Sequence, residues 1–144
     1  MQRLLSLSLL LCLALTCCLA QSGTPYSGGP VVLPGRVEAV NFDVGGEGVG
    51  YHDSDATNSG GSYRPTDAVD IQPCSGCGPT GLNVGWVLPG EWLAYTVSLR
   101  SAGSFTIATK VASDGAGGTF HFELDGKPIT EPTAVPATGG WQGA

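Results

Sequence analysis

Large apolar residues recur at every second position along short stretches of the chain, and turn-forming residues separate these stretches. The clearest stretch covers residues 91–99, where the large apolar side chains are Leu93, Tyr95, Val97 and Leu99. A period of two places them on one face of a β-strand, so this stretch predicts a strand that packs one face against a core.

Shorter stretches of the same kind predict further strands at residues 36–42, 68–71, 82–87, 104–112 and 119–124. Asp125-Gly126 predicts a tight hairpin turn into residues 127–129. No stretch keeps helical periodicity, and turn signals recur about every 8 to 12 residues, as in β-sandwiches. The pattern predicts an all-β fold, a β-sandwich of the jelly-roll type.

The N-terminus has the features of a secretory signal. Arg3 precedes an almost unbroken apolar run at residues 4–15, and Cys18-Leu19-Ala20 offers a small-x-small cleavage site. We expect residues 1–20 to be a signal peptide and the product to be secreted and extracellular; acylation of a cysteine at the end of this run is the less favoured alternative. Residues 21–34, rich in Gly, Ser and Pro, predict a flexible leader, and residues 35–144 a single domain.

Charge narrows the choice of partner. The formal net charge of −6 disfavours nucleic acid and anionic membranes, which attract clustered Lys and Arg. The apolar run at the N-terminus is too short for a membrane span, which needs about 20 apolar residues. We therefore expect no nucleic-acid partner and no membrane partner.

Two cysteines remain after the expected cleavage, Cys74 and Cys77, three positions apart. Tetrahedral zinc needs four ligands, and no second pair follows. A redox site is expected at the start of a helix, whereas this segment is a loop rich in Pro and Gly. A local disulfide that stiffens the loop is the favoured interpretation for an exported protein.

Catalysis has few candidate residues. His52 and His121 are the only histidines, and a G-x-S-x-G nucleophile motif is absent. Asp53 and Asp55 are surrounded by polar residues, which would not raise a carboxyl pKa into the general-acid range. We expect no enzymatic activity of this chain, although Asp53 and His52 remain candidates for hydrogen bonds to a ligand.

Two aromatic residues in polar loops are the strongest candidates for ligand contact. Tyr63 and Trp141 both lie among Gly and polar residues, where a large apolar ring has no core to enter. Sugars present flat C–H faces rimmed by hydroxyls, so aromatic platforms and a few polar groups bind them. The alternatives are that Trp141 covers the edge of a core and that Tyr63 packs within its turn.

Several segments, in this order and at fitting intervals, resemble a carbohydrate-binding module of family 6. They include Gly48-Val49-Gly50-Tyr51-His52-Asp53, Asn58-Ser59-Gly60-Gly61-Ser62-Tyr63-Arg64, Gly90-Glu91-Trp92-Leu93-Ala94-Tyr95-Thr96-Val97 and Thr138-Gly139-Gly140-Trp141-Gln142. The resemblance implies a non-catalytic jelly roll that binds β-linked glucan, xylan or agarose. It implies that Tyr63 and Trp141 sandwich a sugar ring and that His52 or Asp53 contacts the same sugar.

The chain also departs from the family pattern. The family's late Asn and its final strands would lie beyond Ala144, so we expect a module incomplete at its C-terminus, with unpaired strand edges and a gap in its core. Of the two early acids that adjoin a structural calcium in the family, only Glu38 is present. The segment from Cys74 to Gly81 resembles a local insertion.

Two further hypotheses remain from the sequence. One is that the chain is a fragment of a secreted glycoside hydrolase whose catalytic domain lies elsewhere. The other is an extracellular structural or adhesion domain that keeps the fold without the sugar site.

Overall fold

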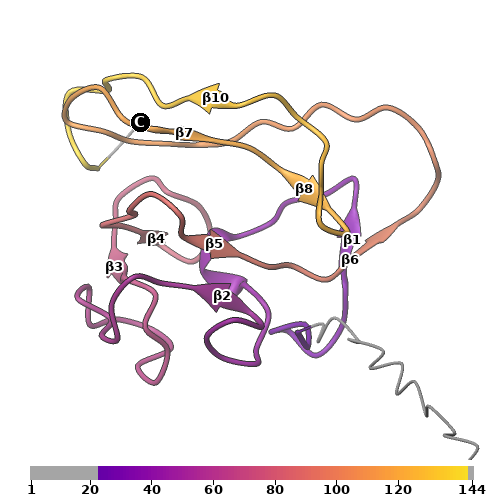
Figure 1. Ribbon diagram of the computed structural model, residues 1–144, viewed down its shortest axis with the longest axis horizontal. Coiled ribbons are helices and arrows are strands. Elements are labelled where there is room, and N and C mark those ends of the chain that lie inside the picture. Colours follow the sequence, from indigo (N-terminus) through magenta and orange to yellow (C-terminus); the bar gives the residue numbers. More distant parts are fainter. Residues whose placement is uncertain (1–22, 143–144) are drawn as a thin grey trace, which may run out of the picture.

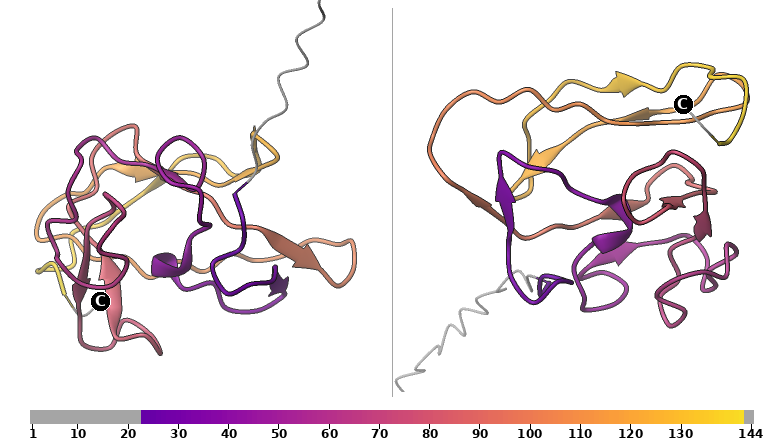
Figure 2. Two further views of the ribbon diagram at one scale, coloured as in Figure 1. Left: turned by 90° about the horizontal axis from the view of Figure 1, so that it is seen from below. Right: turned by 180° about the vertical axis from the view of Figure 1, so that it is seen from behind.

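The computed structural model describes residues 23–142, where short strands and one 3-10 helix are the regular elements and turns and irregular segments connect them. Figure 1 shows two layers, with the C-terminal segments, coloured orange to yellow, lying across the N-terminal half. The fold is all-β, as the alternation predicts, and the same two layers are seen from behind in Figure 2. No helix among these residues has the length and apolar character that crossing a membrane requires.

The strands pair two by two and not in one wide sheet. Four pairs are antiparallel and one, between β1 and β6, is parallel. The pairs are β1 (Val31–Leu33) with β6 (Val97–Leu99), β2 (Tyr51–His52) with β5 (Trp92–Leu93), β3 (Ile71–Pro73) with β4 (Leu82–Val84), β7 (Thr119–Phe120) with β10 (Thr133–Ala134), and β8 (Glu123–Leu124) with β9 (Lys127–Pro128).

The predicted hairpin at Asp125-Gly126 is present between β8 and β9. Asp125 has φ of 50° and Gly126 of 71°, the left-handed values that a type I′ turn requires at both central positions. The predicted hairpin turn and the two strands that it joins are therefore confirmed.

The hydrophobic core lies in the N-terminal layer. Its fully buried members share one cluster: Val40, Phe42, Tyr51, Ala68, Val69 and Ile71. Leu93 and Tyr95, two residues of the clearest predicted strand, pack against this cluster from one face. The alternation at 91–99 thus identified Leu93 and Tyr95 correctly, whereas Leu99 is exposed and the structure splits the stretch into β5 and β6.

The guanidinium of Arg64 lies inside this layer, with its side chain only 3% exposed. It donates to the backbone carbonyls of Phe42 and Asp43, and its Nε lies 2.7 Å from the Asp67 carboxylate. Its central carbon lies 3.4 Å from the centroid of the Phe42 ring. A buried cation of this kind is tolerated because every side of it meets an acceptor, an anion or an aromatic face.

The strand predicted at residues 36–42 is wrong. The structure has a 3-10 helix, η1 (Ala39–Asn41), closed by a hydrogen bond from Asn41 N to the Glu38 carbonyl. The carbonyls of the residues that follow are bound by Arg64 and not by a neighbouring strand. Hydrogen bonds from the Arg64 side chain take the place of strand–strand hydrogen bonds here, so residues 36–42 do not pair with another strand despite their alternation.

Residues 21–34, predicted to be a flexible leader, take part in the fold where the structure describes them. Val31–Leu33 form β1, and Thr24 pairs with Val44 in a bridge. The composition of this segment did not reveal that its backbone finds partners far along the chain. Residues 1–20, with the predicted signal peptide, lie outside the described residues.

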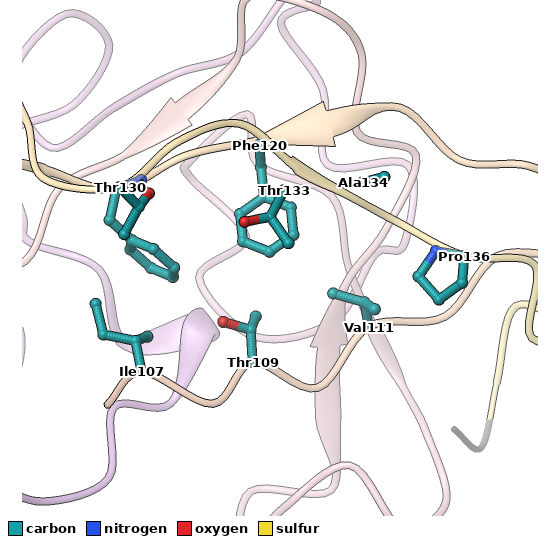
Figure 3. Close-up of a pocket in the computed structure, with 9 residues that line it drawn as sticks. Ile107, Thr109, Val111, Phe120, Thr130, Thr133, Ala134 and Pro136 are labelled. Carbon is teal, nitrogen blue, oxygen red and sulfur yellow. Dashed lines mark hydrogen bonds between the residues drawn. The ribbon is translucent and has the colours of Figure 1, made fainter. Parts of the chain in front are cut away.

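A cavity of about 3630 Å³ separates the two layers and is lined by residues of both. The strand predicted at residues 104–112 is wrong, because this segment makes no backbone hydrogen bond to another strand within residues 23–142. Its side chains nevertheless alternate as predicted: Figure 3 shows Ile107, Thr109 and Val111 on one side, facing Phe120 and Thr133 across a smaller pocket of about 320 Å³. An open edge of this kind was expected from the sequence.

Arg64→Met should lower the free energy of unfolding by about 2 to 4 kcal/mol, because the stem is kept while the buried carbonyls and Asp67 lose their donor. Urea unfolding followed by circular dichroism measures the change. Arg100→Met, at an exposed arginine, is the matched control and should cost little. Equal midpoints for the two variants would show that Arg64 does not hold this layer together.

Candidate functional site

The loop that carries Tyr63 is fastened to β3 by one carboxamide. Asn58 Oδ1 accepts hydrogen bonds from the backbone N–H groups of Gly61 and Ile71, both at 2.9 Å. Its Nδ2 donates to the carbonyls of Ser62 and Tyr63, at 3.1 and 3.2 Å. All the hydrogen-bonding capacity of a carboxamide is used, which fixes the loop against the start of the strand.

Tyr63 is held in a conformation that its loop alone would not favour. Tyr63 and Arg64 both have positive φ, 53° and 45°, a left-handed region that costs energy for residues other than glycine. The Tyr63 hydroxyl donates to Asn41 Oδ1 at 2.9 Å, and its ring is tilted against Tyr26 with centroids 5.6 Å apart. Burial and the neighbouring Tyr26 raise the pKa of Tyr63 to about 12, so the ring stays neutral and its hydroxyl remains a donor.

The aromatic neighbour of Tyr63 in the structure is therefore Tyr26 and not Trp141. Trp141 forms no aromatic pair with Tyr63 in the part of the chain that is described. Tyr26 was missed because it lies in the segment whose composition predicts a leader. About a third of the Tyr63 side chain remains exposed, so one part of the ring is still open.

Trp141 is 64% exposed, at the tip of a turn fixed on both sides. On one side Thr138 binds Ser113, N–H to carbonyl at 2.8 Å, with the Thr138 hydroxyl accepting from Ser113 N at 2.9 Å. On the other side, the amide of Gln142 donates to the carbonyl of Pro73 at 3.4 Å. The exposed ring thus stands on an anchored turn, and covering a core edge is not its role in this structure.

Both aromatic loops are attached to the same edge of β3. The Ile71 carbonyl accepts from Ser62 N at 3.1 Å in the Tyr63 loop, while the Pro73 carbonyl accepts from Gln142. Carbonyls two residues apart point to the same side of a strand, and the inner side is taken by β4. We call this free side the outer edge of β3; its two attachment points are about 7 Å apart, from a rise of ~3.3 Å per residue.

The predicted polar residues lie at the end of β2, which includes His52, and in the turn that follows it, which begins with Asp53. His52 Nδ1 is 2.5 Å from Glu47 Oε1, and the second oxygen of Glu47 accepts from Asp53 N at 3.0 Å. Glu91 binds the backbone and hydroxyl of Ser54 at 3.1 and 2.6 Å. Sequence reasoning missed Glu47 and Glu91, because nothing in their spacing shows that they hold this turn.

The hydrogen bonds, burial and charges in this region shift the pKa values of Glu47, His52 and Asp53. The hydrogen bond to Glu47 raises the pKa of His52, and the same bond lowers the pKa of Glu47. Burial raises the pKa of Asp53, opposed by the N–H of Asp55 and supported by the charges of Glu91 and Asp70. Asp70, directly before β3, also accepts a hydrogen bond from Ser59 N in the Tyr63 loop.

Two side chains contact the carboxylate of Glu38 in the described structure. One oxygen accepts from the Thr80 hydroxyl at 3.1 Å, and the other lies 3.7 Å from Arg36. Calcium takes six to eight oxygen ligands. No group of three or more potential ligands among His, Cys, Asp and Glu is found in residues 23–142.

The predicted disulfide joins Cys74 to Cys77 directly after β3. The smaller pocket of Figure 3 is lined by apolar side chains and threonines and contains none of the predicted site residues. Sugar recognition requires directed polar groups, so the outer edge of β3 is the better candidate.

Comparison with known proteins yields two findings. The model of the family "Carbohydrate binding module (family 6)" matches residues 60–143, more than half of the 144 residues. The chain is also similar to the clotting factor G alpha subunit of Tachypleus tridentatus, with 36% identity over 83 residues. That match covers 56% of this chain and 12% of the relative, so the chain spans only a small part of that protein.

Protonation of His52 should depend on Glu47. We expect the His52 midpoint to lie above its ordinary value of 6.5 and to fall toward it in Glu47→Gln. The ion pair is present between the lowered pKa of Glu47 and the raised pKa of His52, and it is lost as the pH rises through the latter or falls through the former. NMR titration of the imidazole protons measures this; the same midpoint in both proteins would rule the pair out.

Proposed function

Because the chain belongs to the carbohydrate-binding modules of family 6, we propose that it binds a β-linked polysaccharide, of the glucan, xylan or agarose type, at the outer edge of β3. The family is one of non-catalytic binding modules. Binding without chemistry also agrees with a site that offers aromatic faces and hydrogen-bonding groups. The observation that carries the proposal is that the Tyr63 and Trp141 loops are attached to one edge, two residues apart.

The spacing suits one sugar ring. A ring held between two aromatic faces needs about 7 to 8 Å between them, since each contact takes about 3.5 to 4.0 Å. The attachment points are about 7 Å apart along the strand. Tyr63 has one free portion of its ring and Trp141 is largely exposed, so both have surface left for a ligand.

The polar turn supplies candidates for the rim contacts. We assign Asp53 as the acceptor for a sugar hydroxyl, because the charge of Asp70, which holds the Tyr63 loop, acts on its carboxyl group. His52 is already bound to Glu47, and we assign it the role of fixing the turn. A neutral ligand suits a chain with a net charge of −6 better than an acidic polymer does.

Secretion is part of the proposal. It rests on the signal pattern at residues 1–20, and a polysaccharide of cell walls is met outside the cell. The alternative, a fragment of a secreted glycoside hydrolase, requires a catalytic domain in the same gene, which reading the coding DNA would reveal.

Trp141→Ala and Tyr63→Ala should each weaken binding roughly 30-fold or more, because each removes one face of a desolvated contact. Affinity electrophoresis on β-glucan, xylan and agarose measures the loss. Trp86→Ala is the matched control, since Trp86 is comparably exposed but follows β4, on the inner side of β3. Binding that survives both substitutions, or retardation lost equally in the control, would refute the aromatic site.

A further inference from the structure

The segment between β3 and β4 carries the disulfide and has no part in the site as described so far. We call residues 74–81 the disulfide loop. Its two ends are joined by a hydrogen bond from Cys74 N to the Gly81 carbonyl at 2.9 Å, and Cys74 is bonded to Cys77 within it. The loop therefore has a fixed shape directly after the end of β3.

Two segments of the C-terminal layer attach to backbone carbonyls on either side of Cys74. Gln142 donates to the carbonyl of Pro73, the residue before Cys74. The Lys110 ammonium donates to the carbonyl of Gly76, the residue before Cys77, at 2.8 Å. The disulfide spans the chain between these two carbonyls, so it limits how far one can move relative to the other.

These two segments are also joined to each other. Ser113, three residues after Lys110, exchanges hydrogen bonds with Thr138, four residues before Gln142. Ser113 is buried and also pairs with Gly140 in a bridge. The contacts form a closed circuit from the disulfide loop to Lys110, to Ser113, to the Trp141 turn and back to Pro73.

Trp141 lies within this circuit on a part of the chain with little support of its own. Gly139 and Gly140 precede it, and as glycines they have no side chain that could pack against it. Gly139 also has a φ of 78°, a backbone conformation that glycine adopts readily. The direction of the Trp141 ring therefore depends on the two ends of its turn. One end is attached to Ser113, and the other is attached to Pro73, the residue directly before the disulfide loop.

We propose that the Cys74–Cys77 disulfide positions Trp141, and that opening it weakens polysaccharide binding without unfolding the protein. The consequence for binding rests on the function proposed above, whereas the effect on the Trp141 ring does not. Cys74 and Cys77 contact no ligand in this mechanism; they act through Pro73 and Gln142. The segment that resembles an insertion thereby supports the Trp141 side of the site.

The experiment opens the disulfide in the full-length folded protein. A water-soluble phosphine converts it to two thiols; the phosphine takes an oxygen from water to become a phosphine oxide, and the two protons go to the sulfurs. Acrylamide quenching of Trp fluorescence should increase on reduction, and this increase should be absent in Trp141→Phe. Retardation by soluble β-glucan or xylan should weaken about 2- to 10-fold, the factor for losing the order of one side chain.

Two variants serve as controls. The double variant Cys74→Ser/Cys77→Ser should reproduce the weakening and show no response to the phosphine. Gln142→Ala, which removes the contact and keeps the disulfide, should also raise Trp141 quenching and reduce the response to reduction. Far-UV circular dichroism should be unchanged by the phosphine.

Each outcome has a distinct meaning. Unchanged Trp141 quenching on reduction overturns the positioning role. Increased quenching with unchanged affinity overturns its importance for binding. If neither polysaccharide binds in either redox state while quenching still increases, the proposed function fails and the positioning of Trp141 stands.

Discussion

The buried guanidinium of Arg64 is the interaction on which the rest of this structure depends. The strands are only two or three residues long, so their ladders leave many backbone groups without partners. Arg64 supplies donors to carbonyls that no strand reaches, while Phe42 covers its face and Asp67 balances its charge. Tyr63 is the preceding residue and shares its left-handed backbone. The core and the aromatic loop are therefore held by one side chain.

At the outer edge of β3, side chains again make the hydrogen bonds that a neighbouring strand would otherwise make. Asn58 satisfies backbone groups of both the loop and the strand, and Asp70 binds the loop a second time. Strand β3 is short, yet it carries the Tyr63 loop at its start and the Trp141 turn at its end. Its two attachment points are only two residues apart, so a short strand is enough to hold both segments at one edge.

The sequence predicted what local patterns control and missed what distant residues control. The hairpin at Asp125-Gly126 and the core face of Leu93 and Tyr95 follow from turn chemistry and from a period of two. The 3-10 helix at Ala39–Asn41 does not, because the groups that satisfy the chain after it come from Arg64, more than twenty residues away. Tyr26 was hidden for the same reason: only the folded chain brings it to Tyr63.

The two aromatic walls of the candidate site differ in how firmly they are held. The Tyr63 loop has four hydrogen bonds from Asn58 alone, a further bond from its own hydroxyl, and the buried Arg64 beside it. The Trp141 turn has one firm attachment at Ser113 and one long hydrogen bond at Pro73. A ligand that needs a wider or narrower gap would therefore move the Trp141 side. In the proposed site, selectivity among polysaccharides would then depend on how tightly the disulfide loop restrains the Trp141 turn, since the Tyr63 loop is fixed by the core.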